Sequence, residues 1–495
     1  MYTVRYKSHH DASRNLKNRY AAAVTGEAYL PTVLAGSAQS RRVIYIHVPF
    51  CNKVCSFCPF HRPDALDRRT YHEELIREIR RVSVFPYMQA PVEAVNFGGG
   101  TPTSLSPAQM AAVLSALHTH FRIAPDAEIS VETSATELTD AMLDSLVSGG
   151  VNRLSVGIQT FDDGARRLLG RRGSGAAAAA RVAAAMARGI SNTSVDLIYN
   201  YPGQTDGQLV SDLHTIRALD VAGVSIYSLM LHEKTPLYRR LSETERQALL
   251  DLRREKALFD RILDTLGADG YRMLELTKLV KGGRDRYDYM EIRHSGGSCI
   301  ALGRGAGGNI ENYFYHNAAD APVISERIPF SASGRVFVPA YRRLDALVYA
   351  MQKGVVDFGV YSAQIDVDLK TLFSAKLERL CADGFVMMRG DTLSLTRDGL
   401  FFGNNIISEL IDCIAPEKAS AAQRGTALRR RKARIRSDAG LAETANRCMQ
   451  TNGILIRKRQ AIHRRTEAKT AHRPDFFTGA AAFADGRKPH IRTPK

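Results

Sequence analysis

The stretch His47–Pro63, HVPFCNKVCSFCPFHRP, places Cys51, Cys55 and Cys58 within eight residues. The chain has 495 residues and seven cysteines, of which the other four are Cys299, Cys381, Cys413 and Cys448. An odd number of mostly scattered cysteines is not the pattern of a disulfide framework, so we expect a reducing, cytoplasmic environment. Three thiols crowded onto one loop instead indicate a metal or cluster site.

Three kinds of structure fit such a loop. A structural zinc ion needs four ligands, and His61 is a candidate fourth ligand beside the three cysteines. A [4Fe–4S] cluster is ordinarily held by four thiolates, so three cysteines leave one iron open to bind a small molecule. Buried inert cysteines are the remaining alternative, although an exposed loop rich in phenylalanine is a poor place for three of them.

The composition is that of an ordinary globular protein, with 44% hydrophobic residues. No run of about 18 apolar residues is present, so we expect no membrane span, and we see no apolar core of a secretory signal. The net charge is +17, but residues 416–495 contain 20 lysine and arginine residues against 6 aspartate and glutamate residues, so they hold 14 of those charges. The rest of the chain is nearly neutral and gives no electrostatic reason to propose a nucleic acid substrate.

Six β-rich apolar segments recur between residues 41 and 232, separated by helical stretches. This alternation predicts parallel strands joined by crossover helices. Polar and glycine residues occur at or near the ends of the first five strands. The cysteine loop follows the first strand and Gly98–Gly100 follow the second. Glu132 ends the third strand, Gln159 ends the fourth, and Asp196 lies in the fifth. Because function collects at this rim in parallel α/β barrels, we predict an α/β fold built as a partial (β/α)6 barrel.

We divide the chain into five parts: an N-terminal extension (1–40), the barrel (41–240), a barrel extension on the substrate side (241–335), a C-terminal module (336–415) and a basic tail (416–495). The C-terminal module has the pattern helix, short hairpin, helix, which resembles a winged helix. It carries no basic stripe, so we predict an α+β module that either has a packing role or covers the substrate. The tail has few large apolar residues and is predicted to be disordered; a contact with RNA, DNA or an acidic surface is its alternative.

The spacing C-x3-C-x2-C on the loop after the first strand, with Phe57 before the last cysteine, resembles the signature of radical S-adenosylmethionine enzymes. The resemblance implies a [4Fe–4S] cluster held by Cys51, Cys55 and Cys58, with S-adenosylmethionine chelated at the open iron. Transfer of an electron then cleaves the sulfonium and gives a 5′-deoxyadenosyl radical. The resemblance also implies an electron donor of the flavodoxin or ferredoxin type.

Residues 41–414 resemble the oxygen-independent coproporphyrinogen III oxidase family. The matching strings, in order, are YIHVPFC, GGGTPTSLS, GVNRLSVGIQTFDD, RRLLGR, DLIYNYPGQT and LSLTRDGLFFGNNI. Relatives in this family share a tetrapyrrole-type ligand, and members can hold two S-adenosylmethionine molecules. The resemblance therefore implies a porphyrin-type ligand and one or two bound cofactor molecules.

The resemblance also assigns cofactor contacts residue by residue. The positions that line the cluster-bound S-adenosylmethionine are Tyr45, Gly99 and Glu132, and those that line the second molecule are Phe57, Gly100, Thr101, Gln159, Arg171 and Asp196. By its chemistry, Arg171 can form a bidentate pair with a carboxylate, and Asp196 can accept hydrogen bonds from hydroxyl or ammonium donors. A salt bridge at the rim is the structural alternative for both side chains.

The sequence favours one reaction within this family. Cys58 is followed by Pro-Phe-His-Arg, which departs from the true oxidases. The strings GVNRLSVGIQTF and GRDRYDYMEIRHSGGSCIALGRGAGG resemble the heme-utilisation branch, whose members use a methyl group from S-adenosylmethionine and a radical to open the heme macrocycle. We therefore predict a methyltransferase of that branch, with oxidative decarboxylation of coproporphyrinogen III to protoporphyrinogen IX and a non-catalytic heme chaperone as alternatives.

Candidate contacts to a tetrapyrrole are Arg284 and Arg286 for propionates, Tyr287 and Tyr289 for the ring face, and His61, His294 and His316 as axial ligands to heme iron. For the arginines and tyrosines, an exposed charged loop is the structural alternative. The string ALGRGAGG (Ala301–Gly308) either brings backbone close to a ligand or forms a tight turn.

Overall fold

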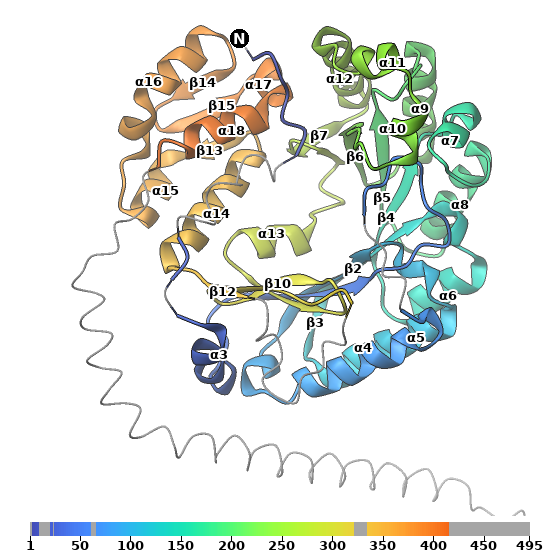
Figure 1. Ribbon diagram of the computed structural model, residues 1–495, viewed down its shortest axis with the longest axis vertical. Helices are drawn as coiled ribbons and strands as arrows, with labels where there is room; N and C mark the ends of the chain where they lie inside the picture. Colours follow the sequence, from blue (N-terminus) through green and yellow to red (C-terminus); the bar gives the residue numbers. More distant parts are fainter. Residues whose placement is uncertain (1, 9–19, 23, 61–65, 321–333, 415–495) are drawn as a thin grey trace, which may run out of the picture. The chain divides into compact units, whose positions relative to one another are not determined.

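The computed structural model describes residues 2–8, 20–22, 24–60, 66–320 and 334–414 (Figure 1). The predictions made for the basic tail and for His61 fall outside these residues. In the part of the chain that is described, no helix has both the length and the apolar character needed to pass through a membrane.

Six parallel strands form the centre of the fold, in the order in which they follow along the chain. They are β1 (Arg42–Val48), β2 (Val92–Gly99), β3 (Ile123–Ser134), β4 (Arg153–Gln159), β5 (Asn192–Tyr199) and β6 (Gly223–Ser228). Each pairs in parallel with the next, with Tyr45 opposite Asn96 and Gly157 opposite Asp196. The predicted α/β fold with a core of parallel strands is confirmed.

The sheet continues beyond both ends of this series, which the sequence did not predict. Beside β1 lie β9 (Ser298–Leu302), β10 (Gly307–Ile310), β11 (Tyr313–His316) and β12 (Arg335–Val336), and beside β6 lie β8 (Lys278–Lys281) and β7 (Tyr271–Glu275). Within the described residues the sheet has twelve strands, of which β9 is parallel to β1 and the other additions are antiparallel. These strands are too short for a period-two pattern to be recognised in the sequence.

Helices cover the outer face of the parallel strands (Figure 1). They are α4 (Arg68–Val82), α5 (Pro107–His120), α6 (Asp140–Ser148), α7 (Asp163–Leu168), α8 (Gly175–Ala187), α9 (Asp206–Leu219), α10 (Pro236–Arg240), α11 (Glu243–Ala248) and α12 (Leu252–Ala268). Their starts follow local sequence, because Ser106 with Gln109 and Thr205 with Gln208 form reciprocal capping boxes in front of α5 and α9. The apolar faces of most of these helices pack with the strands into one buried core, and α7 and α10 contribute to a second, smaller apolar cluster.

Buried ions close the barrel interior at the amino ends of the strands. The Arg153 guanidinium donates to both carboxylate oxygens of Asp285, over 3.0 and 3.1 Å, and the Lys278 ammonium lies 2.9 Å from the same carboxylate. Burial would raise the pKa of Asp285, but the charges of Lys278 and Arg153 hold that pKa well below its usual range. The helix that follows, α13 (Asp288–His294), lies inside the ring of elements in Figure 1. Since an unpaired buried charge is costly, these ion pairs fix this part of the chain inside the barrel.

The C-terminal module has an apolar core of its own. Its elements are α14 (Pro339–Gln352), β13 (Val355–Asp357), α15 (Phe358–Ile365), α16 (Leu369–Ala382), β14 (Val386–Arg389), β15 (Thr392–Leu395), α17 (Arg397–Phe401) and α18 (Gly403–Ile411). Within residues 334–414, three strands pair antiparallel in the order β13-β15-β14. Its likeness to a winged helix stays a prediction.

Residues 2–8 connect this module to the barrel. Arg5 donates to the carbonyl oxygen of Phe401 in α17 over 2.6 Å and to the hydroxyl of Tyr199 in β5 over 2.8 Å. The same guanidinium forms an ion pair with the buried carboxylate of Glu255 in α12. The start of the chain therefore links three elements that are far apart in sequence, while the domain boundaries drawn from the sequence stay a prediction.

A buried carboxyl group supports the loop after β9. Glu78 in α4 accepts hydrogen bonds from the Gly303 N–H over 2.8 Å and from Asn317 Nδ2 over 3.5 Å. The residue is only 3% exposed. Burial raises the pKa of Glu78 to about 8, and the charge of Glu74 adds to this increase while the Gly303 hydrogen bond opposes it. The folded state therefore holds the Glu78 proton at neutral pH.

We expect the Glu78→Gln variant to gain stability relative to the wild type as pH rises. The folded pKa of Glu78, about 8, lies above its ordinary value of 4.5, so the wild type loses free energy of unfolding between these two values. Gln keeps an acceptor oxygen for Gly303 but does not ionise. Urea unfolding of both proteins at about pH 5, 7 and 9 measures the difference. The exposed Glu73→Gln is the control, and a Glu78→Gln difference that is constant with pH would contradict a protonated buried carboxyl.

Candidate functional site

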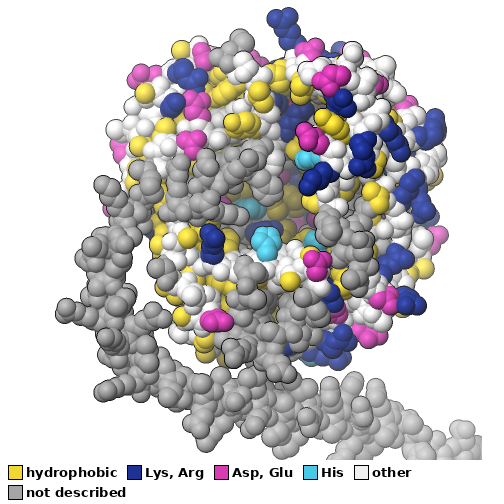
Figure 2. Space-filling view, in the orientation of Figure 1, with side chains coloured by type: hydrophobic (Ala, Val, Ile, Leu, Met, Phe, Trp, Pro, Cys, Tyr) yellow, Lys and Arg dark blue, Asp and Glu magenta, His cyan; other side chains and the backbone are white. Residues whose placement is uncertain are grey.

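A cavity of about 600 Å³ opens where the parallel strands end, and Figure 2 shows a hollow near the middle of the molecular face. All twelve residues that the sequence singled out line this cavity: Tyr45, Cys51, Cys55, Phe57, Cys58, Gly99, Gly100, Thr101, Glu132, Gln159, Arg171 and Asp196. They come from separate strands and loops, so it is the parallel arrangement that brings them together. Their individual roles as ligands remain a proposal.

Hydrogen bonds of Ser56 hold the cysteine loop against the neighbouring segments of the chain. The Ser56 N–H donates to the carbonyl oxygen of Leu169 over 3.1 Å, and its hydroxyl donates to that of Leu168 over 2.7 Å. The Ser56 carbonyl oxygen accepts from the Leu237 N–H over 2.8 Å. Gly170 has φ of +73°, and a Cβ there would lie 2.8 Å from the Ser56 nitrogen. The loop thus rests against the end of α7 and the start of α10, and a side chain at position 170 would displace it.

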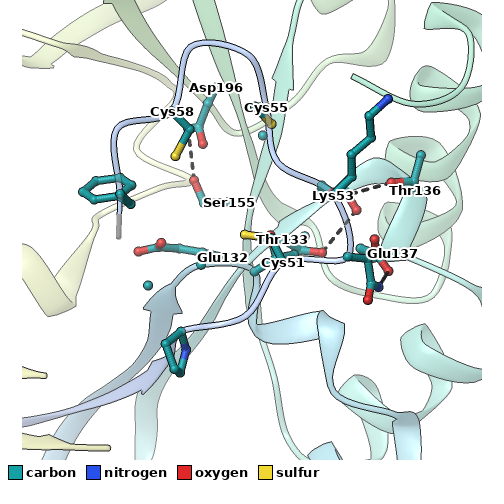
Figure 3. A pocket seen from close by; sticks show the side chains of 18 of the residues that line it. Cys51, Lys53, Cys55, Cys58, Glu132, Thr133, Thr136, Glu137, Ser155 and Asp196 are labelled. Atoms are coloured by element: carbon teal, nitrogen blue, oxygen red, sulfur yellow. Dashed lines mark hydrogen bonds between the residues drawn. The ribbon is translucent and has the colours of Figure 1, made fainter. Parts of the chain in front are cut away.

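Figure 3 shows Cys51, Cys55 and Cys58 along this loop at the edge of the cavity. Thr101 Oγ1 donates to Cys51 Sγ over 3.4 Å, and an Arg171 guanidinium nitrogen donates to Cys55 Sγ over 3.2 Å. Of the described cysteines, no fourth lines the cavity. The described chain therefore supplies three thiols at this place.

The two metal groups considered for these thiols, a single zinc ion and a [4Fe–4S] cluster, need different arrangements of ligands. Among the described residues, no three His, Cys, Asp or Glu side chains are placed so that they could hold one metal ion. A [4Fe–4S] cluster needs no such convergence, because each thiolate binds a different iron. The residues present fit a cluster with one iron open, because three thiols line the cavity and no fourth described cysteine does.

The turn Gly98–Gly100 is shaped by contacts within the protein. Gly99 has φ of +109°, a conformation that other residues rarely adopt. A Cβ on Gly98 would lie 2.8 Å from Glu132 Oε1, and a Cβ on Gly100 would lie 2.4 Å from the carbonyl oxygen of Phe50. The sequence indicated that the backbone approaches a ligand here. The structure adds that these glycines let the turn pack against Glu132 and the start of the cysteine loop.

Glu132, near the end of β3, points into the cavity (Figure 3). Asn96 Nδ2 donates to its Oε1 over 3.2 Å. Burial raises the pKa of Glu132 to about 7; the Asn96 hydrogen bond opposes this shift, and the charge of Asp196 adds to it. At neutral pH the carboxyl group is therefore divided between its two protonation states, and a cationic ligand in the cavity would favour the ionised one.

A second polar group on the cavity wall comes from β4, β5 and the loop after α7. Gln159 lies at a β-bulge with φ of +72°, a strained conformation typical of functional sites. Ser155 Oγ donates to Asp196 Oδ1 over 3.2 Å (Figure 3), and Arg171 also donates to the carbonyl oxygen of Gly157. In the described chain, neither Arg171 nor Asp196 forms an ion pair, so the rim salt bridge raised as an alternative is not made.

Sequence reasoning missed His47 as a cavity residue. Its Nδ1 lies 3.0 Å from the Tyr45 hydroxyl, and its ring packs over Gly99. Burial, and to a lesser extent His316, lowers the pKa of His47 to about 4, so the imidazole is neutral. The period of two in a strand was the available signal, because it places His47 on the same face as Tyr45.

The loop after β9 also contributes to the wall. Arg304, Gly305 and Ala319 line the cavity, and the Arg304 guanidinium pairs with Glu74 over 2.7 Å. Gly303 has φ of +95° and Gly305 has φ of +76°, so the glycines of ALGRGAGG form tight turns that bring this segment to the site.

Of the side chains predicted to contact a tetrapyrrole, the six that lie within the described residues do not line the cavity. Arg284 pairs with Asp220 over 3.1 Å, and Arg286 pairs with Asp288 over 2.8 Å. Tyr287 lies under the Arg153 guanidinium, and Tyr289 is buried. His294 stacks on Tyr349, and His316 lies beside Gly307. These predicted contacts are therefore not supported by the geometry. Apart from Asp288, the partner of Arg286, these partners are distant in sequence, so the pattern of arginine and tyrosine alone could not reveal them.

Comparison with known proteins identifies related chains. The sequence profile of the Radical SAM superfamily matches residues 45–216. The chain is 30% identical over 393 residues to anaerobilin synthase from Escherichia coli O157:H7, covering 78% of this chain and 87% of that one. It is 26% identical to the heme chaperone HemW from Bacillus subtilis, covering 74% and 98%. Among solved structures, coproporphyrinogen III oxidase (HemN) from Escherichia coli matches with a TM-score of 0.67 at 21% identity, covering 83% and 96%.

We expect Gly170→Ala to reduce the iron bound by the chain after anaerobic reconstitution to less than about half. The new Cβ would push against the Ser56 nitrogen and so displace the cysteine loop. Gly173→Ala is the matched control, because Gly173 also has positive φ, +70°, but its Cβ would find no atom closer than 3.6 Å. Both variants carry a backbone penalty of roughly 1–2 kcal/mol. Equal iron content in the two would show that Gly170 does not hold the loop.

Proposed function

The chain belongs to the radical S-adenosylmethionine superfamily, in the coproporphyrinogen III oxidase-like family, and from this premise we propose that it is an enzyme acting on a porphyrin-type tetrapyrrole. The cofactors of the superfamily are a [4Fe–4S] cluster and S-adenosylmethionine. One observation carries the proposal: Cys51, Cys55 and Cys58 line a single cavity together with every residue to which the resemblance assigned a contact with S-adenosylmethionine.

In this proposal the three cysteines hold the cluster and leave one iron free. The bound cofactors supply a one-electron cleavage of the sulfonium that yields a carbon-centred radical. Thr101 and Arg171 donate hydrogen bonds to two of the cysteine sulfurs, and such donors stabilise negative charge on a cluster. The loop and its Phe57, which packs on an apolar cluster beside α7 and α10, limit the access of water.

The polar groups of the cavity divide into two sets that can orient S-adenosylmethionine. Glu132, held by Asn96, is placed to accept from the ammonium or hydroxyl groups of the molecule at the cluster. Arg171 and Asp196 offer a cation and an anion for the carboxylate and the hydroxyls of a second molecule. Neither has an ion-pair partner in the described chain, so both charges are available for a ligand.

The preferred reaction is methyl transfer with radical opening of heme, as the similarity to anaerobilin synthase favours. A non-catalytic heme chaperone is the second candidate, favoured by the length match to HemW, of which the chain covers 98%. Decarboxylation of coproporphyrinogen III is the third, since HemN shares the fold. All three have a tetrapyrrole ligand in common, so that ligand class is the firmer part of the proposal.

The deciding experiment offers heme and coproporphyrinogen III in parallel to the anaerobically reconstituted chain. We expect 5′-deoxyadenosine and an opened, methylated heme product by mass spectrometry. Cys55→Ser should bind less iron and form neither product, because one corner of the cluster loses its thiolate. Protoporphyrinogen from the second substrate would instead favour the oxidase. Stoichiometric heme binding without 5′-deoxyadenosine would favour the chaperone and contradict the enzymatic proposal.

We expect Asp196→Asn to lower product formation by about 10- to 100-fold, because a hydrogen bond to a charged group contributes about 1.5–3 kcal/mol. Asn still accepts the hydrogen bond from Ser155, so the variant removes the charge and keeps the position. Iron content and cluster absorbance should stay at the wild-type level. Ser155→Ala removes only the orienting bond and should have a smaller effect. Unchanged turnover in Asp196→Asn would remove the role proposed for this carboxylate.

A further inference from the structure

Basic side chains lie on and around the cysteine loop, and two of them, Lys53 and Arg172, also line the cavity. We call this set the basic rim; its members are Lys53, Arg167, Arg172, Lys234, Arg239 and Arg240. All six are exposed, and in the described chain none of their charged groups has an ion-pair partner. By contrast, Arg181 and Arg188 on the neighbouring α8 are both paired with Asp140.

Main-chain contacts place the members of the basic rim around one loop. Arg167 lies in α7, and Arg172 follows it, on either side of Leu169 and Gly170, which contact Ser56. Arg239 and Arg240 end α10, whose Leu237 donates to the Ser56 carbonyl oxygen. Figure 2 shows lysine and arginine side chains over the side of the face where α7 to α10 lie in Figure 1.

The charge of this surface is local. The segments 51–60, 163–172 and 232–240 contain only two acidic residues, Asp163 and Glu233. The chain up to residue 415 carries a net charge of only +3, so the basic rim is an uneven concentration of positive charge on a nearly neutral body. Two apolar side chains of the same loop are exposed within it, Val54 at 49% and Phe60 at 74%.

We propose that the basic rim is the docking surface for an acidic electron-carrier protein of the flavin or iron–sulfur type. This inference rests on the proposed function, because it requires a cluster at Cys51, Cys55 and Cys58. The carrier loses one electron and is oxidised, and the cluster gains that electron and is reduced, with no proton or group transferred.

The chemistry of the surface matches this partner. Electron transfer weakens steeply with distance, so a carrier must reach the loop that holds the cluster. Cys51, Cys55 and Cys58 are each partly exposed and line the cavity beside this loop. Such encounters are brief and use small interfaces, in which charge complementarity steers association and a few apolar side chains make the contact. The basic rim, whose cations have no ion-pair partner within the described residues, together with the exposed Val54 and Phe60 has this composition.

The test measures how fast the oxidised cluster of the reconstituted full chain is reduced by a purified acidic flavodoxin in its reduced form. The variant Arg167→Glu/Arg239→Glu/Arg240→Glu reverses three charges of the basic rim and leaves the cavity residues intact. The matched control, Arg253→Glu/Arg343→Glu/Arg389→Glu, reverses three exposed, unpaired charges on α12 and in the C-terminal module. Light-reduced deazaflavin, a small reductant, measures the intrinsic reducibility of the cluster.

We expect the basic-rim variant to lose about tenfold or more of the rate with flavodoxin at low salt, and the difference to shrink as salt is added. Iron content, reduction by deazaflavin and 5′-deoxyadenosine formation with deazaflavin should match the wild type. The milder Arg239→Gln/Arg240→Gln should give a smaller loss, which keeps the test valid if the triple variant does not fold.

Equal flavodoxin rates in the basic-rim variant, the control and the wild type would overturn the docking surface while leaving the proposed function intact. Tight binding of an RNA oligonucleotide by the basic rim, with unchanged flavodoxin rates, would overturn it in favour of a nucleic acid. A wild-type chain that binds no cluster, or cleaves no S-adenosylmethionine with deazaflavin, would overturn the proposed function and the docking surface together.

Discussion

The site depends on how an irregular loop is held in place by the chain around it. A loop that presents three thiols has few hydrogen bonds of its own, so its position must come from outside. Ser56 uses its N–H, hydroxyl and carbonyl groups to bind the end of α7 and the start of α10. At the other end, the Thr101 N–H donates to the carbonyl oxygen of Phe50 over 2.7 Å. Gly100 and Gly170 permit these contacts because neither has a Cβ to obstruct them.

The charged side chains at the two ends of the barrel interior differ in whether they form ion pairs. At the amino ends of the strands, Arg153, Lys278 and Asp285 are buried together and satisfy one another. At the carboxyl ends, Arg171 and Asp196 face a cavity without ion-pair partners in the described chain. Paired charges stabilise the closed end, while the open end keeps charges for ligands. This division is the usual one in parallel α/β folds, where the carboxyl ends of the strands carry the chemistry.

The fold by itself does not select among the reactions of the family. The oxidase shares its architecture with this chain, and the heme chaperone and anaerobilin synthase share its sequence pattern. Differences between such proteins reside in the residues that line the substrate side of the cavity. In this chain the cavity wall includes His47, a neutral imidazole, and Arg304, which is held by Glu74. Of the arginines and tyrosines of residues 284–289, Tyr287 packs under Arg153 at the closed end of the barrel, while Arg284 and Arg286 pair with Asp220 and Asp288.

The sequence alone determined the superfamily, the parallel α/β core and the set of twelve cavity residues, because they depend on the spacing of the cysteines and on the alternation of strands and helices along the chain. The cysteines lie on one loop, and the other residues lie at or near strand ends, whose parallel pairing places them at one rim. Only the tertiary structure showed that short strands extend both edges of the sheet and that His47 lines the cavity. It also showed that Arg284 forms an ion pair with Asp220, which lies in a different segment of the chain. It also decided that the cations around the cysteine loop are left unpaired. Ion pairs and pairings between edge strands bring together residues that are distant along the chain. A local sequence pattern does not indicate which distant residue will be the partner.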